Sequence, residues 1–555
     1  FKGDAIMGMT GKEIVETQKK YYLQSWAKQK DVNPIPMEKA EGIYLWDYDG
    51  NRYTDMSSTQ VNVNLGYGNE DINNAMKEQI DKFAWMGPGY GVESRAKLAK
   101  MIVDLMPDNM GKVFFTNGGA DANENAIKMA RMYTGRYKVM SRYRSYHGST
   151  FGAGNLTGEP RRFPLEPGIP GFVKFFDPYL YRESIRFESE EAATEYYIAK
   201  LREQIIYEGR DQIAAIILET VTGTNGIIIP PKGYLQGVRK LCDEFGIVMI
   251  CDEVMAGWCR TGKMFAFMNF DVKPDIVTFA KGVTCGYIQL GGACVSKEIA
   301  AYFDDHTLSC GLTYCGHPLA CAAGVACVNY YTKANILDNV NKVGAVLAKK
   351  LDEFKEKYNC VGDVRHIGLF SCVEFVKDKK TKEPIVPYGQ DPYGKLPKII
   401  GSLRAKGFLT FGHENMVLCN PPLIITEEQL LEELDKLAEQ QDTVEEDKTE
   451  HWKGFEPGQW QADEKSNMAV WSCPSCGAEI VTDATTAATF CYYCHNPVVL
   501  GKRLEGKYLP NKVIPFKISK KEAEKRFLEY VGKKKFVPKA FFNKKQIECL
   551  SGVYF

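Results

Sequence analysis

Short apolar runs alternate with longer segments of helical periodicity between about residue 40 and residue 330. The runs hold nearly continuous Val, Ile and Phe, a content typical of strands that are covered on both faces of a sheet. They lie at residues 112–117, 137–142, 212–220, 246–254 and 274–282. Because strands that alternate with helices usually pair in parallel, the pattern predicts an α/β domain with a mainly parallel sheet.

A different pattern follows between residues 330 and 440. Residues 335–357 have the period of an amphipathic helix, residues 370–376 form a strand-like run, and residues 426–440 indicate a final helix. Thr426 stands at the start of that last helix and is a residue type found at helix caps. This mixture predicts a smaller α+β domain.

The composition changes twice after this region. Residues 427–465 contain 14 acidic residues and 4 Lys, with little aliphatic periodicity after residue 440, which indicates an acidic linker. Residues 501–555 contain 15 Lys or Arg and 5 Glu. The C-terminal part is therefore expected to be a separate, basic module.

The whole chain has 555 residues, 45% hydrophobic and 25% charged, which is enough for a large core and about three domains. Lys plus Arg and Asp plus Glu both total 70, so the overall charge does not indicate nucleic acid or an anionic membrane as a partner. There is no apolar run of about 18 residues and no signal peptide, so we expect a soluble, cytoplasmic protein without a membrane partner. The start without Met and the end inside a strand-like run are typical of a truncated chain.

Two carboxylates, Asp252 and Glu253, stand near the end of the predicted strand at residues 246–254. Open α/β sheets bind ligands at this edge, although a helix cap or a salt bridge would also explain an Asp there. Lys281 ends the next predicted strand and is therefore expected close to Asp252. A lysine that forms a Schiff base and an Asp that pairs with a pyridinium nitrogen are what pyridoxal phosphate chemistry requires.

An anion site is predicted at residues 117–120, Asn-Gly-Gly-Ala, between a strand and a helix. Small residues there allow backbone N–H groups at the helix N-terminus to approach a phosphate. Such a turn is not specific by itself.

Six motifs then occur in order: FFTNGGADANENAIKMAR, SYHGST, IILETVTGTNG, ICDEVMAGWCRTG, PDIVTFAKG and LTYCGHPLACAAG. In sequence and spacing they resemble the class III (ω-) aminotransferases of the fold type I group. The resemblance covers residues 10–440, about four fifths of the chain. It implies a large domain with a mainly parallel sheet, a smaller α+β domain, and pyridoxal 5′-phosphate as the cofactor.

The resemblance also implies roles for individual residues. Lys281 would be the Schiff-base lysine and the proton carrier, and Asp252 would hold the pyridinium nitrogen. Tyr146 would stack on one face of the cofactor ring and Val254 would press on the other. Glu219 would lie near the reacting atoms, where it gates an arginine or fixes its polar neighbours.

The phosphate would be held by Gly118, Gly119 and Ala120, helped by Thr313 from the neighbouring subunit of a homodimer. His147 has two interpretations: it supports the residues that contact the cofactor, or it is a purely structural histidine.

The chain departs from the family pattern at several positions. Many members have Ser-Gly-Ser at residues 118–120, and several have an arginine for the substrate carboxylate where Phe411 stands. A replacement is expected from Arg161 and Arg162, because an arginine fork binds a carboxylate or sulfonate through two hydrogen bonds. They lie in a segment that resembles that of taurine–pyruvate and β-alanine–pyruvate aminotransferases. Val61 replaces a large aromatic pocket residue of some relatives.

The tail contains two CxxC pairs, Cys473 with Cys476 and Cys491 with Cys494. Four thiolates complete a tetrahedral zinc site with no open position, so the metal would be structural. A redox dithiol is the alternative, although it would not need the second pair. The segment resembles a bacterial zinc ribbon. Lys residues interleaved with Phe and Tyr after it make nucleic acid a further candidate partner.

These observations divide the chain into six predicted parts. They are an N-terminal segment that joins the small domain (1–55), the large cofactor-binding domain (56–329), the small domain (330–440), the acidic linker (441–468), the zinc ribbon (469–500) and the basic tail (501–555).

The predicted function is transfer of an amino group from an ω-amino acid or amine, such as taurine or β-alanine, to pyruvate or another 2-oxo acid. Another fold type I reaction, such as decarboxylation or an aminomutase reaction, would use the same Lys281 and Asp252. A third hypothesis is a regulator that senses amines and binds nucleic acid through its tail.

Overall fold

The computed structural model describes residues 8–391, 393–442, 468–472, 479–483, 488–490 and 497–499. It divides into two compact units, Phe1–Asp442 and Thr443–Phe555, and each is considered by itself. The four predicted zinc ligands lie outside the described residues. The finer predicted division, with boundaries at residues 55, 329 and 440, is not tested by these two units.

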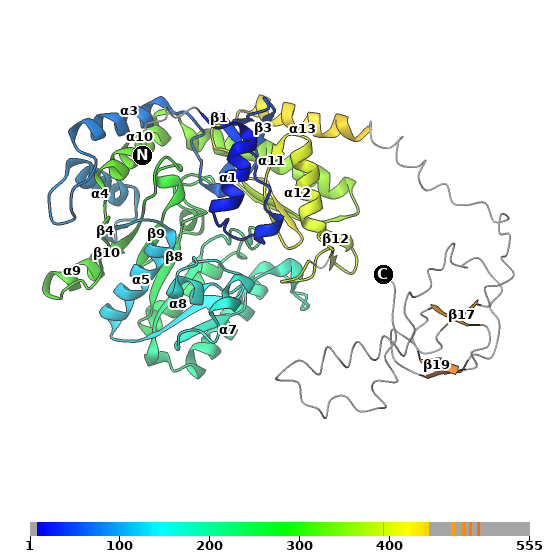
Figure 1. The fold of residues 1–555 in the computed structure, drawn as a ribbon. Helices are drawn as coiled ribbons and strands as arrows, with labels where there is room; N and C mark the ends of the chain where they lie inside the picture. The colour runs from blue at the N-terminus through cyan, green and yellow to red at the C-terminus, as the bar shows by residue number, and fades with distance from the viewer. Residues whose placement is uncertain are drawn as a thin grey trace, which may run out of the picture. The chain divides into compact units, whose positions relative to one another are not determined.

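A seven-stranded sheet forms the centre of the first unit (Figure 1). Its strands, in spatial order, are β4 (Met110–Thr116), β10 (Gly291–Ser296), β9 (Ile276–Phe279), β8 (Val248–Asp252), β7 (Ile213–Glu219), β5 (Lys138–Arg142) and β6 (Phe172–Phe175). Only β10 runs antiparallel to its two neighbours. The predicted mainly parallel α/β sheet is confirmed, as are its five expected strands.

Helices cover both faces of this sheet because its strands are buried on both sides. Alternate residues of β7 point to opposite faces: Ile217 packs with residues of α5 (Gly119–Thr134), whereas Ile216 packs with residues of α8 (Tyr234–Phe245). Figure 1 shows α5 and α8 beside the sheet, with α7 (Glu190–Tyr207) next to α8. The apolar runs of the sequence are thus explained by two apolar layers.

A strand of the N-terminal segment pairs with a strand from near residue 408. The sheet β1 (Met37–Glu41), β2 (Tyr44–Asp47) and β3 (Arg52–Asp55) is extended by β14 (Phe408–Leu409), which lies parallel to β3. A second sheet consists of β11 (Val361–Ile367), β12 (Phe370–Asp378), β16 (Met416–Leu418), β15 (Gly412–His413) and β13 (Glu383–Pro384). The predicted α+β character of this region is confirmed.

The first unit contains further helices, which occur before, between and after these strands along the sequence. They are α1 (Gly11–Tyr21), α2 (Ser58–Val61), α3 (Glu70–Lys82), α4 (Glu93–Leu105), α6 (Phe151–Leu156), α9 (Lys297–Asp305), α10 (Pro318–Lys333), α11 (Ile336–Lys357), α12 (Lys395–Ala405) and α13 (Glu427–Asp442). Short 3₁₀ turns that matter for the site are η2 (Pro160–Leu165) and η6 (Lys281–Val283). Within the described residues, no helix is both long and apolar enough to cross a bilayer.

The second unit contains two short antiparallel strand pairs. β17 (Met468–Ser472) pairs with β18 (Glu479–Asp483), and β19 (Ala488–Phe490) pairs with β20 (Pro497–Val499). In sequence, one CxxC pair falls between the strands of each hairpin.

Candidate active site

A cavity of about 1090 Å³ opens at the carboxyl edge of the seven-stranded sheet. Glu219 is the last residue of β7, Asp252 is the last of β8, and Lys281 follows β9 at the start of η6. All three line the cavity. Parallel strands bring their carboxyl ends to one edge, so residues far apart in sequence meet there.

Asp252 is buried and tightly held. Its Oδ2 accepts hydrogen bonds from Asn123 Nδ2 at 2.8 Å and shares a 2.7 Å hydrogen bond with His147 Nδ1, while its Oδ1 accepts from the backbone N–H of Val254 at 3.0 Å. Asn123 is itself fixed by the Thr278 hydroxyl, which donates to its Oδ1 at 2.7 Å. These partners fix the orientation of the carboxylate.

His147 is the buried neighbour of Asp252, and its Nε2 has no hydrogen-bond partner among the described residues. The structure thus brings His147 to Asp252 and to the cavity wall. Its second ring nitrogen is one of several polar atoms around this cavity that lack a partner within the described part of the chain.

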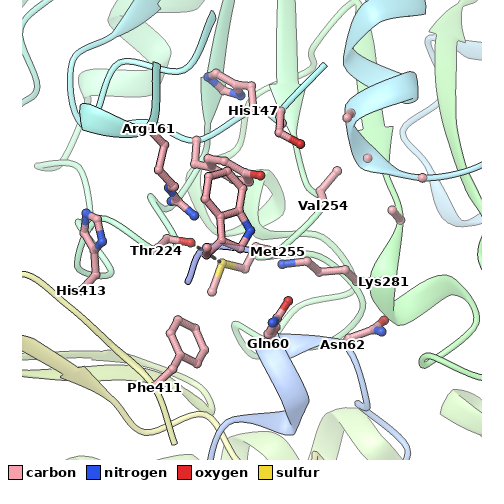
Figure 2. A pocket seen from close by; sticks show the side chains of 18 of the residues that line it. Gln60, Asn62, His147, Arg161, Thr224, Val254, Met255, Lys281, Phe411 and His413 are labelled. Atoms are coloured by element: carbon pink, nitrogen blue, oxygen red, sulfur yellow. Dashed lines mark hydrogen bonds between the residues drawn. The ribbon is translucent and has the colours of Figure 1, made fainter. Parts of the chain in front are cut away.

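Lys281 points into the cavity (Figure 2). Burial lowers the pKa of its amine to about 8, although the Asp252 and Glu219 carboxylates act in the opposite direction. Its φ of 45° is in the left-handed region, which is unusual for a residue other than glycine. Strained backbone of this kind is often found at functional sites.

The N-terminus of α5 forms another wall of the cavity. Gly118 caps this 16-residue helix without a side-chain hydrogen bond, and Gly119 begins it. A Cβ on Gly119 would lie 2.7 Å from Val254 Cγ1, so a larger residue would not fit. The first N–H groups of a helix have no partner within the helix, so together with Ala120 these glycines form a cradle suited to a phosphate.

Glu219 orients the segment that carries Tyr146. Its Oε1 accepts from the backbone N–H of Tyr146 at 3.0 Å and its Oε2 from that of Gly223 at 2.7 Å. Burial raises the pKa of Glu219, although His147 opposes this effect. The Tyr146 ring is contacted by the Arg161 guanidinium, 3.8 Å from the ring centroid.

Arg161 and His413 form the other end of the cavity, away from the sheet. Arg161 Nε pairs with the buried Glu159, and its Nη2 is buried without a partner among the described residues. His413 Nε2 likewise lacks a hydrogen bond within that set, and burial, followed by Arg161 and Arg144, lowers the pKa of His413 to about 4. Figure 2 shows both side chains on the same side of the cavity as Phe411.

Three residues with predicted roles do not line the cavity of the chain. Val61 is 1% exposed and packs in a core cluster with Phe370. Arg162 pairs with Glu166, and its Nε donates to the Gly158 carbonyl at 3.0 Å. Thr313 is exposed.

The predicted residues that do line the cavity come from both parts of the unit. They are Gly118, Gly119, Ala120, Tyr146, His147, Arg161, Glu219, Asp252, Val254, Lys281 and Phe411.

Sequence reasoning does not find Asn123, Gln60, Glu159 and His413. Asn123 has a detectable signal, because it lies one helical turn after the glycine pair on the side that faces the strand ends. Gln60 lines the cavity because residues 58–61 all have positive φ, which turns its neighbour Val61 into the core. No glycine in the sequence indicates that turn.

Known proteins resemble this chain over most of the first unit. The family model for class-III aminotransferases matches residues 25–440. Taurine–pyruvate aminotransferase of Bilophila wadsworthia is 34% identical over 443 residues, which cover 76% of this chain and 95% of that protein.

Two solved structures give the same result. Taurine:2-oxoglutarate aminotransferase from Bifidobacterium kashiwanohense, in complex with PLP and glutamate, has a TM-score of 0.77 and 53% identity, covering 79% of this chain and 99% of that chain. A thermostable (S)-enantioselective ω-transaminase from Thermomicrobium roseum has a TM-score of 0.74 and 33% identity, covering 78% and 99%. These similarities confirm the expected fold type I α/β architecture.

Proposed function

Because the chain belongs to the class-III aminotransferases, and is thus a transaminase that depends on pyridoxal 5′-phosphate, we propose that its donor is an ω-amino acid such as taurine or β-alanine. The proposed acceptor is a 2-oxo acid, with pyruvate and 2-oxoglutarate as the candidates that the names of the two taurine aminotransferases suggest. The observation that supports an acid-bearing donor is Arg161 Nη2, which shares the cavity with Lys281 and has no partner among the described residues.

The residues present fit the cofactor. The glycine cradle at the α5 N-terminus suits a phosphate, and a half-buried amine lies in the same cavity as a buried carboxylate. When bound, pyridoxal phosphate supplies an electron sink for the charge left as a proton leaves the substrate carbon. Lys281 Nζ is the proposed covalent anchor and the group that moves this proton, which a pKa of about 8 favours near neutral pH.

Asp252 is proposed to face the ring nitrogen, since its two oxygens are held by His147, Asn123 and the Val254 N–H. His147 supports Asp252 in this arrangement. Tyr146 and Val254 would bracket the ring, and Glu219 would fix the Tyr146 backbone.

The phosphate is proposed to lie against residues 118–120, with Thr313 of a second chain completing its contacts in a homodimer. Thr313 is exposed in the single chain, as a residue that reaches a neighbour must be.

The acid group of the donor is assigned to Arg161. Its Nε is already paired with Glu159, which fixes the guanidinium and leaves Nη2 for an incoming carboxylate or sulfonate. Arg162 would hold the loop through Glu166, and Val61 would support Gln60 from the core.

The decisive test is the visible absorbance of the holoenzyme. Taurine or β-alanine should bleach the cofactor band, and pyruvate or 2-oxoglutarate should restore it. The oxo product of the donor should appear in equal amount. Release of CO₂, racemisation or an isomeric amine without bleaching would contradict transamination and favour another fold type I reaction.

The tail is proposed to bind structural zinc through Cys473, Cys476, Cys491 and Cys494, each pair lying between two strands that form a hairpin. Metal analysis of the full chain and of Cys476→Ser tests this: the variant should lose about one zinc per chain but keep its transaminase activity. Retained zinc would contradict the assignment.

The proposed location is the cytoplasm, in keeping with the free thiols of the described residues.

A further inference from the structure

Three buried polar atoms without hydrogen-bond partners among the described residues gather at the Arg161 end of the cavity, and two of them, His413 Nε2 and Glu414 Oε1, lie 3.9 Å apart. They are Arg161 Nη2, His413 Nε2 and Glu414 Oε1, and all three residues line the cavity. Buried polar atoms in proteins nearly always have a hydrogen-bond partner, so a cluster of exceptions in one cavity indicates a place for a polar ligand or for water.

Glu159 lies between the Arg161 and His413 side chains. Its Oε1 pairs with Arg161 Nε, and its Oε2 lies 3.7 Å from His413 Nε2. Glu159 is fully buried in the turn before η2, whereas His413 comes from β15 in the other part of the unit. Arg161 and His413 thus face the cavity from different elements with one carboxylate between them.

The charges in this cluster are balanced before a substrate enters. Glu159 is paired with Arg161, and Glu414 Oε2 lies 3.2 Å from Arg144 Nη1. His413 adds no charge while it is neutral. A carboxylate or sulfonate that binds at Arg161 would therefore leave one uncompensated negative charge in a buried place, which is costly unless a cation joins it.

We infer that His413 is a specificity-determining residue that contacts the acid group of the donor together with Arg161 and takes up one proton from solvent as this group binds. The inference rests on the proposed function, because it requires an acid-bearing donor in this cavity. Glu159 is the positioning residue, because it pairs with Arg161 Nε and lies 3.7 Å from His413 Nε2.

The direction of the pH effect follows from the groups that face His413. These are Glu159 and Arg161 from the η2 region, Arg144 from the loop after β5, and Glu414 beside it in sequence. In the empty cavity, burial and the two arginines keep the pKa of His413 near 4. A bound anion offsets Arg161 and raises that pKa, so the acid-bearing donor should bind more tightly as the pH falls from 8 towards 5.5.

The test compares taurine with n-propylamine, which lacks an acid group, in the half-reaction of the holoenzyme. We measure the bleaching of the cofactor band from pH 5.5 to 8 in the wild type, His413→Gln and His413→Ala. Gln places a neutral N–H near the position of Nε2 but cannot take up the proton. His366→Gln, outside the cavity, is the matched control.

The expected readout is the ratio of apparent Kd for taurine to that for n-propylamine, because shared titrations of the cofactor end cancel in it. As the pH is lowered, this ratio should fall in the wild type and in His366→Gln, and stay flat in His413→Gln. In His413→Ala the ratio should be roughly tenfold higher than in the wild type, as expected for loss of a hydrogen bond to a charged group. Reaction with n-propylamine checks that each variant is folded and loaded.

The outcomes separate the two proposals. A pH-dependent ratio that persists in both His413 variants would overturn the role of His413 while the transaminase reaction stands. Bleaching by n-propylamine but not by taurine or β-alanine would overturn the acid-bearing donor, and the inference with it.

Discussion

The two ends of the cavity are built in different ways. At the sheet end, Asp252 and Glu219 come from adjacent strands, and each of their carboxylate oxygens accepts at least one hydrogen bond. At the other end, Arg161 and His413 come from a turn and a two-residue strand, and both have a nitrogen without a partner among the described residues. His147 Nε2 at the sheet end also lacks a partner among the described residues, so the contrast lies in the charged groups: carboxylates held on both oxygens suit a cofactor that stays in the site, whereas unpaired groups suit substrates that come and go.

The largest effect is expected at the sheet end. Lys281→Ala should abolish turnover and the covalent cofactor band, because no other amine among the described residues lines the cavity. Steady-state rates and the absorbance spectrum measure this, and thermal unfolding should show an intact fold. Lys273→Ala, on the surface in a pair with Asp108, is the control. Transamination by Lys281→Ala would refute the assignment of the active site.

Asp252→Asn should lower kcat by roughly 100- to 1000-fold while cofactor remains bound, because a buried electrostatic partner is lost and the phosphate cradle is untouched. The matched control is Glu253→Gln. Glu253 is the next residue and equally buried, but it accepts from the Ala266 and Phe267 N–H groups and does not line the cavity. An equal loss in both variants would mean that general disruption of the strand end, and not the charge of Asp252, causes the effect.

Arg161→Lys tests the opposite end and should affect only acid-bearing donors. The arginine fork pairs with Glu159 through one nitrogen and offers a second nitrogen to the substrate. Lysine has a single nitrogen and cannot do both, so kcat/KM for taurine should fall roughly 10- to 100-fold. The value for n-propylamine should change little. Arg162→Lys separates the two adjacent arginines, because Arg162 does not line the cavity. A larger loss in Arg162→Lys would move the acid site to that residue.

The same contrast explains how far the sequence predicts this protein. Strand ends follow from local apolar runs, so the amino-acid pattern is enough to place Asp252 and Lys281 at one edge of the sheet. β10 is not among the predicted strands, because it begins with Gly291-Gly292 and a run of small residues carries little strand signal.

Other cavity residues depend on contacts between distant parts of the chain as well as on local ones. The left-handed turn at residues 58–61 is held by Asp55, which accepts from the backbone N–H of Ser57 and Thr59, and by the Ser58 hydroxyl, which donates to the Asn420 carbonyl. A contact between residues 362 positions apart thus helps to hold the turn in which Gln60, and not Val61, lines the cavity. Glu159 and His413 meet by the same kind of long-range packing.

The smallest expected effect concerns the pH at which the sheet end becomes reactive. An amine must be unprotonated to capture an aldehyde, and burial lowers the pKa of Lys281 to about 8 from the usual value near 10.5. The rate at which the cofactor-free protein develops the cofactor band should therefore rise about tenfold from pH 6 to 7 and level off above 8. Arg161→Lys should leave the midpoint within a few tenths of a unit, since lysine keeps the positive charge and since burial, Asp252 and Glu219 affect the pKa of Lys281 more than Arg161 does. A midpoint near 10 would mean that Lys281 is not desolvated, and the two ends would then differ in their hydrogen bonding alone.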